Sequence, residues 1–263
     1  MVDSIASGTA AGPRFAIGRA LSLSFGVLGR NLVPMGVVSL IVTAIQSVIE
    51  LVLAGGASDS DSGGSSFLNL FSYAIITAPV TYATFQDLRG TPVSLGGMFS
   101  KGYGSIGRVV GAALVLGFVI IVPVLIAMFA GLGLGMPLTL AGGVCGIFVL
   151  YIFVAWFVVV PVLVVEDVRF FAGFGRALDL SKGRRWSILG LLLVYVVIMI
   201  AIGAVMVTLM VLFPEAVILH ALLLIPFGAF YSVIGAVLPA VVYYLLRSEK
   251  EGVGIDEIAR VFD

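Results

Sequence analysis

FAGFGRALDLSKGRRWSILG, the stretch from Phe171 to Gly190, joins a basic segment to the start of a long apolar run. Its beginning recurs near the N-terminus, where GRALSLS at positions 18–24 matches GRALDLS at positions 175–181 in six of seven residues. Apolar residues in the basic segment are spaced by three and four, which is typical of an amphipathic helix. We expect this helix to lie in the plane of a membrane, with its Lys and Arg side chains reaching lipid headgroups. We call such a segment an elbow helix.

The composition of the chain indicates a membrane protein. Of its 263 residues, 61% are hydrophobic and 11% are charged, which is more apolar surface than one globular core can bury. Residues 1–12 have neither the basic nor the apolar region of a cleaved signal peptide, so we expect the first apolar span to direct membrane insertion. The chain is therefore predicted to be a single membrane domain, residues 1–263.

Apolar runs predict how often the chain crosses the membrane. A helix needs about 20 residues to cross the hydrocarbon core, and six runs are this long. Runs of this length indicate helices rather than a barrel, whose strands are shorter and alternate in polarity. The predicted fold is all-α, with spans at about Leu32–Ala54, Phe67–Phe85, Val109–Ala130, Leu138–Val165, Ile188–Phe213 and Ala221–Leu245.

The basic residues predict the topology. If the six spans cross the membrane in alternating directions, all 14 Lys and Arg residues fall on one side of it. Because basic residues stay in the cytoplasm, both termini are expected to be cytoplasmic. The opposite loops hold only Asp59, Asp61, Glu215 and His220 as titratable residues.

The elbow pattern occurs three times. A shift of 78 residues places the pattern that ends at Arg30 on a weaker copy that ends at Arg108, and a further 79 residues reach the copy at Phe171. Each unit is predicted to contain an elbow helix, an outgoing span, an outer turn and a returning span with a proline. The predicted repeats cover about 13–90, 91–169 and 170–247, with elbow helices at Phe15–Arg30, Val93–Arg108 and Phe171–Arg185 and a cytoplasmic tail at 248–263.

Two further features of these repeats leave alternatives open. Each elbow could instead be a solvated basic loop, because its glycines weaken helix propensity. Pro79, Pro161 and Pro239 could each kink a returning span at a matching depth, either as a hinge or as an ordinary proline of a membrane helix. The tail, with Ile255, Ile258, Ala259 and Phe262 at helical spacing, could form a short amphipathic helix that docks under the bundle or on a partner.

Two motifs carry a family resemblance. GRALDLSKGRRWSILG follows PVLVVED at positions 161–167, and the chain continues to YYLLRSEKEG at positions 243–252. This order resembles the glycerophosphoryl diester phosphodiesterase membrane-domain family and the related YciC-like bacterial membrane proteins, over nearly the whole chain. The resemblance implies a multi-pass protein of the bacterial inner membrane. It implies no phosphodiesterase activity, because the chain has no room for the soluble catalytic domain of that family.

Motifs for chemistry are scarce. Cys145 is the only cysteine and His220 the only histidine, which excludes a site rich in these two ligands. The chain has no Gly-rich phosphate loop and no G-x-S-x-G motif. We therefore expect no catalytic activity, no metal and no cofactor, and we expect no nucleic acid partner because the basic residues serve the membrane.

A polar face in the first span is the main intramembrane candidate. Ser39, Thr43, Gln46 and Glu50 follow spacings of four, three and four, so they share one helix face. They could form a polar path or ligand site in the first repeat. They could instead make interhelical hydrogen bonds, with Glu50 close to the outer surface. Gly142 and Gly146 predict a close helix packing face.

The third elbow is the main lipid candidate. Arg176, Lys182, Arg184, Arg185 and Trp186 could bind an anionic headgroup or a protein partner, with Trp186 as an interfacial anchor. The leading prediction is a non-enzymatic protein that handles lipid or organises the membrane, possible partners being membrane lipids, a second copy or another membrane protein. The alternatives are a transporter or channel that uses the first repeat and, third, a lipid phosphodiesterase.

Overall fold

The structure is a computed structural model that describes residues 15–53, 63–133, 137–166, 168–213 and 217–259. Within these ranges every regular element is a helix, of the α, π or 3-10 type, which confirms the predicted all-α class.

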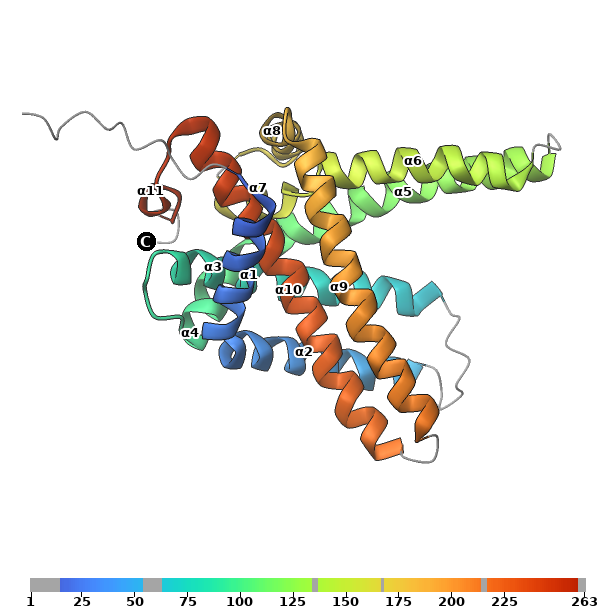
Figure 1. The fold of residues 1–263 in the computed structure, drawn as a ribbon, viewed down its shortest axis with the longest axis horizontal. Coiled ribbons are helices and arrows are strands. Elements are labelled where there is room, and N and C mark those ends of the chain that lie inside the picture. The colour runs from blue at the N-terminus through green and yellow to red at the C-terminus, as the bar shows by residue number, and fades with distance from the viewer. Residues whose placement is uncertain (1–14, 54–62, 134–136, 167, 214–216, 260–263) are drawn as a thin grey trace, which may run out of the picture.

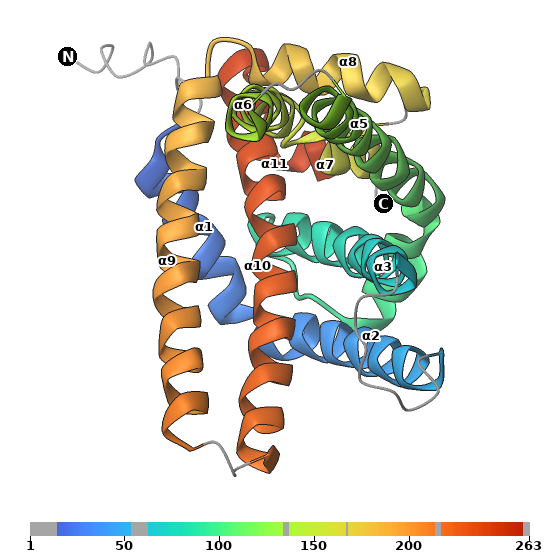
Figure 2. The same cartoon turned by 90° about the vertical axis from the view of Figure 1, so that its right-hand side faces the viewer.

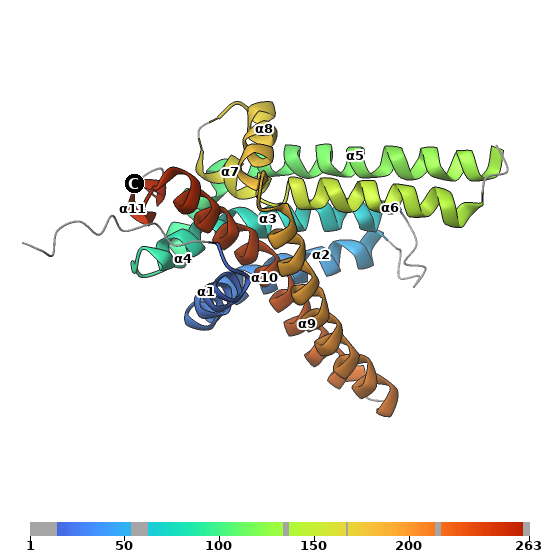
Figure 3. The same ribbon diagram turned by 45° about the horizontal axis from the view of Figure 1, so that its top comes forward.

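Three helical hairpins build the molecule (Figure 1). Figures 2 and 3 show that the first two hairpins project to the same side and that the third leaves at a large angle to them. The hairpins are α2 (Leu32–Leu53) with α3 (Gly63–Leu88), α5 (Ile106–Gly133) with α6 (Leu138–Ala155), and α9 (Arg185–Leu212) with α10 (Val217–Glu251).

Five segments of the described chain are long and apolar enough to cross a membrane. They lie in α2, α5, α6 with its continuation to Val165, α9 and α10. The protein is thus a multi-pass membrane protein by helix length and composition. The 26-residue helix α3 covers the predicted second span but is not among these five segments. The second span, and with it the count of six spans, therefore stays a prediction.

The predicted fourth span is not one straight helix. α6 ends at Ala155, a turn follows at positions 156–158, and α7 covers Val159–Val165. The break lies just before Pro161, which has no N–H to donate to a carbonyl one turn earlier. Pro79 and Pro239, by contrast, lie inside unbroken helices. The break therefore brings α7 into the core, where all seven of its residues are buried.

The core lies where the hairpins meet. α10 packs against α2, α3 and α7, and the ring of Tyr243 meets that of Phe85 edge to face at 5.9 Å. Both rings are fully buried. Away from this junction the helices expose apolar side chains, such as Val197, Val207 and Val211 of α9. Such an exposed apolar surface is suited to lipid rather than to water.

The three elbows differ from one another. The first is α1 (Ile17–Arg30), which buries Ala20, Ser24, Val27 and Leu28, as an amphipathic helix requires. The third is α8 (Phe170–Ser181), which ends earlier than predicted because Gly183 adopts a left-handed φ of 82° and turns the chain. Arg184 and Arg185 therefore begin the outgoing helix α9 and do not belong to the elbow.

The second elbow is not a helix of four turns. It consists of α4 (Leu95–Gly97), a π segment (Met98–Gly102) and a 3-10 turn (Tyr103–Ser105). Gly102 explains part of this irregularity, because a Cβ there would lie 2.6 Å from Cα of Pro79. The close approach of this backbone to α3 thus requires glycine.

The last described helix is α11 (Ile255–Ala259), which contacts α3 and α10 and buries Ile258. The tail thus docks under the bundle, while Phe262 lies outside the described residues. The predicted close packing at Gly142 and Gly146 is not seen among the described residues. Both glycines are exposed, and a Cβ at either would meet no atom within 4 Å.

Candidate functional site

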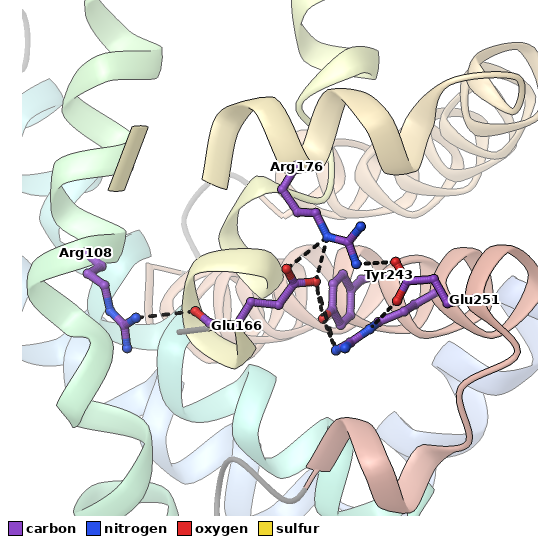
Figure 4. A network of polar contacts seen from close by, with 6 residues as sticks. Arg108, Glu166, Arg176, Tyr243 and Glu251 are labelled. Atoms are coloured by element: carbon purple, nitrogen blue, oxygen red, sulfur yellow. Dashed lines mark hydrogen bonds and ion pairs between the residues drawn. The ribbon is translucent and has the colours of Figure 1, made fainter. Parts of the chain in front are cut away.

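A charged cluster joins α7, α8 and α10 where the hairpins meet (Figure 4). Its centre is Glu166, which follows the last residue of α7 and whose side chain is 11% exposed. The carboxylate accepts hydrogen bonds from Arg176 Nε, at 3.2 Å to Oε1 and 2.9 Å to Oε2, and from the Tyr243 hydroxyl at 2.9 Å. We call the five residues Glu166, Arg176, Tyr243, Arg247 and Glu251 the Glu166 cluster.

The remaining contacts close this cluster. Arg247 donates to the Tyr243 hydroxyl at 2.9 Å and to Glu251 at 2.9 Å, and Glu251 also pairs with Arg176. Burial lowers the pKa of Arg176, but its hydrogen bonds to Glu166 and Glu251 outweigh burial and raise the pKa above its ordinary value. Two guanidinium groups thus balance two carboxylates, so the cluster serves as a junction between helices.

The end of α10 is tied to the start of α9 in the same way. Arg184 pairs with Glu249, and the other oxygen of Glu249 accepts the backbone N–H of Phe15 at 2.9 Å. Lys250 Nζ donates to the carbonyls of Asp179 at 2.6 Å and Lys182 at 2.7 Å, which satisfies acceptors at the C-terminus of α8. The basic residues Arg184 and Lys250 therefore have partners within the protein.

Arg185 has a different environment. Its Nη1 donates to the Tyr151 hydroxyl at 2.7 Å, and its guanidinium carbon lies 5.1 Å from the centre of the Tyr151 ring. Its Nε is buried without an acceptor in the described part of the chain. A carboxylate partner is found neither for Arg185 nor for the exposed Lys182 among the described residues.

The structure thus divides the five predicted residues of the third elbow into two groups. Arg176 and Arg184 are neutralised by carboxylates inside the protein. Lys182, Arg185 and Trp186 surround the turn between α8 and α9, and Trp186 is 85% exposed. We call these three residues the basic corner.

An aromatic cleft lies between the three hairpins. Its volume is about 350 Å³, and residues of α3, α5, α6, α7, α9 and α10 line it. The lining includes Tyr73, Phe153, Trp156, Leu192, Tyr195 and Tyr231, and it contains no charged residue. The indole Nε1 of Trp156 is buried without an acceptor in the described part of the chain. The cleft is therefore suited to hydrocarbon rather than to an ion.

The predicted polar face of α2 does not line this cleft. Ser39 is buried and donates to the carbonyl of Ala229 in α10 at 3.2 Å, which favours the interhelical interpretation. The carbonyl of Thr43 accepts from the Ser47 hydroxyl at 3.0 Å. Gln46 borders a separate, mainly apolar cavity between α2 and α3, and the side chain of Glu50 lies outside the described ones. The described residues of this face are thus not brought together around one ligand.

The sequence analysis missed the Glu166 cluster. It identified Arg176 as a lipid candidate, and the motifs that it quoted contain Glu166, Tyr243 and Glu251, but it predicted no contact among these residues. The available signal was opposite charge at the ends of predicted spans, because Glu166 directly follows the fourth span and Glu251 follows the sixth. Charge alone could not select the pairs, because Glu249 and Glu251 lie two residues apart and bind different arginines.

Neither metal chemistry nor similarity adds to this site. Among the described residues, no group of three or more His, Cys, Asp or Glu side chains could hold a metal ion. Comparison of the chain with protein-family models, curated proteins and solved structures finds no match. The family resemblance stays a prediction, and function must be argued from the cleft and the basic corner.

Proposed function

We propose that the protein is a non-enzymatic, lipid-binding protein of the bacterial inner membrane, and that the aromatic cleft holds part of a lipid molecule. The observation that carries this proposal is the lining of the cleft, which is aromatic and aliphatic and has no charged side chain. Its volume of about 350 Å³ is within the range of small-molecule sites, about 300–1,000 Å³. In a bilayer, lipid is the most abundant ligand for such a surface.

The transporter alternative has less support. A path for a polar substrate requires polar or charged groups that converge on a cavity. Ser39 instead bonds to the backbone of α10, and neither Thr43 nor Gln46 borders the cleft. The position of the cleft between three hairpins favours lipid handling, in which helices part to admit a chain from the bilayer.

The proposed topology has six spans, with α3 as the second. α3 packs against α2, α5 and α10, and its residues Thr77, Thr81 and Thr84 are buried in the protein rather than exposed to lipid. Thr77, for example, is buried and donates to the carbonyl of Tyr73 at 2.6 Å. Membrane helices tolerate such residues where neighbours or their own backbone satisfy them. Both termini are then cytoplasmic by the distribution of basic residues.

Three contacts support the proposed three-fold repeat. Each joins an arginine just before or at the start of an outgoing helix to the end of the returning helix of the same hairpin. Arg30 binds Asp87, Arg108 donates to the carbonyl of Glu166 at 3.5 Å, and Arg184 binds Glu249. The second of these differs from the others because the acceptor is a backbone carbonyl (Figure 4).

Native mass spectrometry of the purified protein tests the function. Gly235 lines the cleft, and a Cβ there would meet no atom within 4 Å, so the side chain of Gly235→Leu should begin in open space and occupy part of the cleft. Gly228→Leu is the matched control, because Gly228 also lies in α10 with free space but does not line the cleft. We expect the wild type and the control to retain lipid and Gly235→Leu to lose it. Equal retention by all three proteins, or none by the wild type, contradicts the proposal.

A further inference from the structure

We infer that the lipid held by the aromatic cleft is an anionic phospholipid, and that Arg185 and Lys182 of the basic corner bind its phosphate. This inference rests on the proposed function and adds the headgroup class and the residues that select it. Four features of the described residues support it.

The first feature is the hydrogen bonding of the Arg185 guanidinium. Tyr151 holds it by one hydrogen bond of 2.7 Å and by the face of its ring, so the group is fixed in place. A guanidinium has five N–H donors, and Tyr151 takes one of them. The buried Nε–H has no acceptor in the described part of the chain, and a buried donor without a partner costs free energy. Because protein atoms cover the Nε–H, a lipid phosphate would instead bind the remaining N–H donors on Nη1 and Nη2, and one phosphate can accept two such donors.

The second feature is charge. The cations Arg176 and Arg184 are balanced by carboxylates, whereas Lys182 and Arg185 have no such partner among the described residues. Two unbalanced positive charges attract a lipid with a net negative charge more strongly than a zwitterionic lipid. Charge thus distinguishes the basic corner from the balanced Glu166 cluster.

The third feature is the expected depth of the basic corner in the membrane. Trp186 is 85% exposed and Phe171, at the start of α8, is 77% exposed. Large aromatic side chains that no protein covers, next to basic residues, are typical of the membrane interface. The corner therefore lies at the level of lipid headgroups and not in the aqueous phase.

The fourth feature is continuity with the cleft. Arg185, Leu192 and Tyr195 are spaced by seven and three residues, so they share one face of α9. Leu192 and Tyr195 line the cleft, and seven residues of helix rise by about 10 Å. One lipid can thus place its phosphate at the corner and an acyl chain in the cleft.

The test measures which lipid the intact protein retains from an equimolar mixture of phosphatidylglycerol and phosphatidylethanolamine in detergent, by native mass spectrometry. We expect the wild type to prefer phosphatidylglycerol. Arg185→Gln and Lys182→Gln should each reduce this preference about fivefold, the change that corresponds to about 1 kcal/mol for one basic residue near the surface. Arg19→Gln removes one charge from the exposed face of α1 and should leave the preference unchanged.

Two further variants make the result decisive. Tyr151→Phe keeps the ring but removes the hydroxyl that holds Arg185, so it should reduce the preference without changing any charge. Gly235→Leu should abolish retention of both lipids, because the headgroup and the chain belong to one molecule.

The two proposals fail in different ways. Lipid that is retained by the wild type and lost from Gly235→Leu, with the same headgroup preference in Arg185→Gln and Lys182→Gln, overturns the headgroup inference and leaves the lipid-binding function intact. Retention of phosphatidylglycerol by Gly235→Leu at the level of the wild type overturns the cleft as the lipid site, and with it both the proposed function and the single-lipid arrangement. Absence of any retained lipid in the wild type overturns both proposals.

Discussion

Arg30 and Asp87 are 57 residues apart in the sequence, yet they form a two-point ion pair between the ends of α1 and α3. Arg30 donates through Nε at 3.1 Å and through Nη2 at 2.6 Å, and the hydrogen bond to Asp87 raises the pKa of Arg30. Asn31, which is 7% exposed, adds a third hydrogen bond to the same carboxylate at 2.6 Å. The first elbow is thus fastened to the returning helix of its own hairpin.

Removing this acceptor should loosen the first hairpin. We expect Asp87→Ala to lower the free energy of unfolding by about 1–3 kcal/mol, because it leaves the buried Asn31 amide short of one acceptor. The exposed Arg30 adds little to this value, since solvent screens its charge. Denaturation with SDS from mild detergent micelles measures the change. Asp179→Ala, at an exposed position of α8, is the control, and an equal loss in that variant would contradict a specific role for Asp87.

A second prediction concerns the contact between the irregular elbow and α3. A Cβ at Gly102 would lie 2.6 Å from Cα and 3.0 Å from Cβ of Pro79, and backbone cannot yield as a side chain can. We expect Gly102→Ala to lower the free energy of unfolding by about 1–3 kcal/mol, as overpacking does in cores. Gly104, two residues away, is exposed and has no atom within 4 Å of a Cβ position. Gly104→Ala should therefore unfold like the wild type, and the same SDS titration compares the two variants.

The features that the sequence could predict are those that depend on local pattern. The length of the apolar runs predicted where α2, α5, α9 and α10 lie, and the apolar spacing from Ile17 to Arg30 predicted α1. The features that it could not predict depend on tertiary contacts. The broken second elbow follows from the approach of Gly102 to Pro79, which no pattern within Val93–Arg108 reveals.

The candidate site was predictable only in part, for the same reason. The sequence predicted a helix from Phe171, which α8 confirms up to Ser181 but not to Arg185, and it could not show which of the basic residues there would be balanced. Arg184 and Arg185 are neighbours in the chain, and one binds Glu249 whereas the other binds Tyr151. The start of α9 at Arg185 turns their side chains to different sides. The aromatic cleft unites residues from Tyr73 to Pro239, a separation that no local pattern spans.

The Glu166 cluster should behave as one energetic unit. Tyr243→Phe removes one donor from the Glu166 carboxylate and the acceptor of Arg247, so it should lower the free energy of unfolding by about 1–2 kcal/mol. After Glu166→Gln has removed the charged acceptor, the same substitution should cost less. A double-mutant cycle in detergent micelles should thus give a coupling of about 1 kcal/mol, within the range for residues that share a network. Additive effects of the two substitutions would contradict a shared network.

The last prediction tests whether α3 crosses the membrane. Six spans place the loop before α3 outside and the exposed residue Ser100, which follows α3, in the cytoplasm. A single cysteine can report each side after Cys145→Ala has removed the only native thiol. We expect Ser58→Cys, in the segment outside the described residues, to react in intact cells with a thiol reagent that cannot cross the inner membrane, and Ser100→Cys to react only after lysis. If α3 instead stays on one side, both cysteines react under the same condition. In that case every segment after α3 would lie on the side of the membrane opposite to the one that six spans predict. The basic residues before α2 and those between α3 and α5 would then lie on opposite sides.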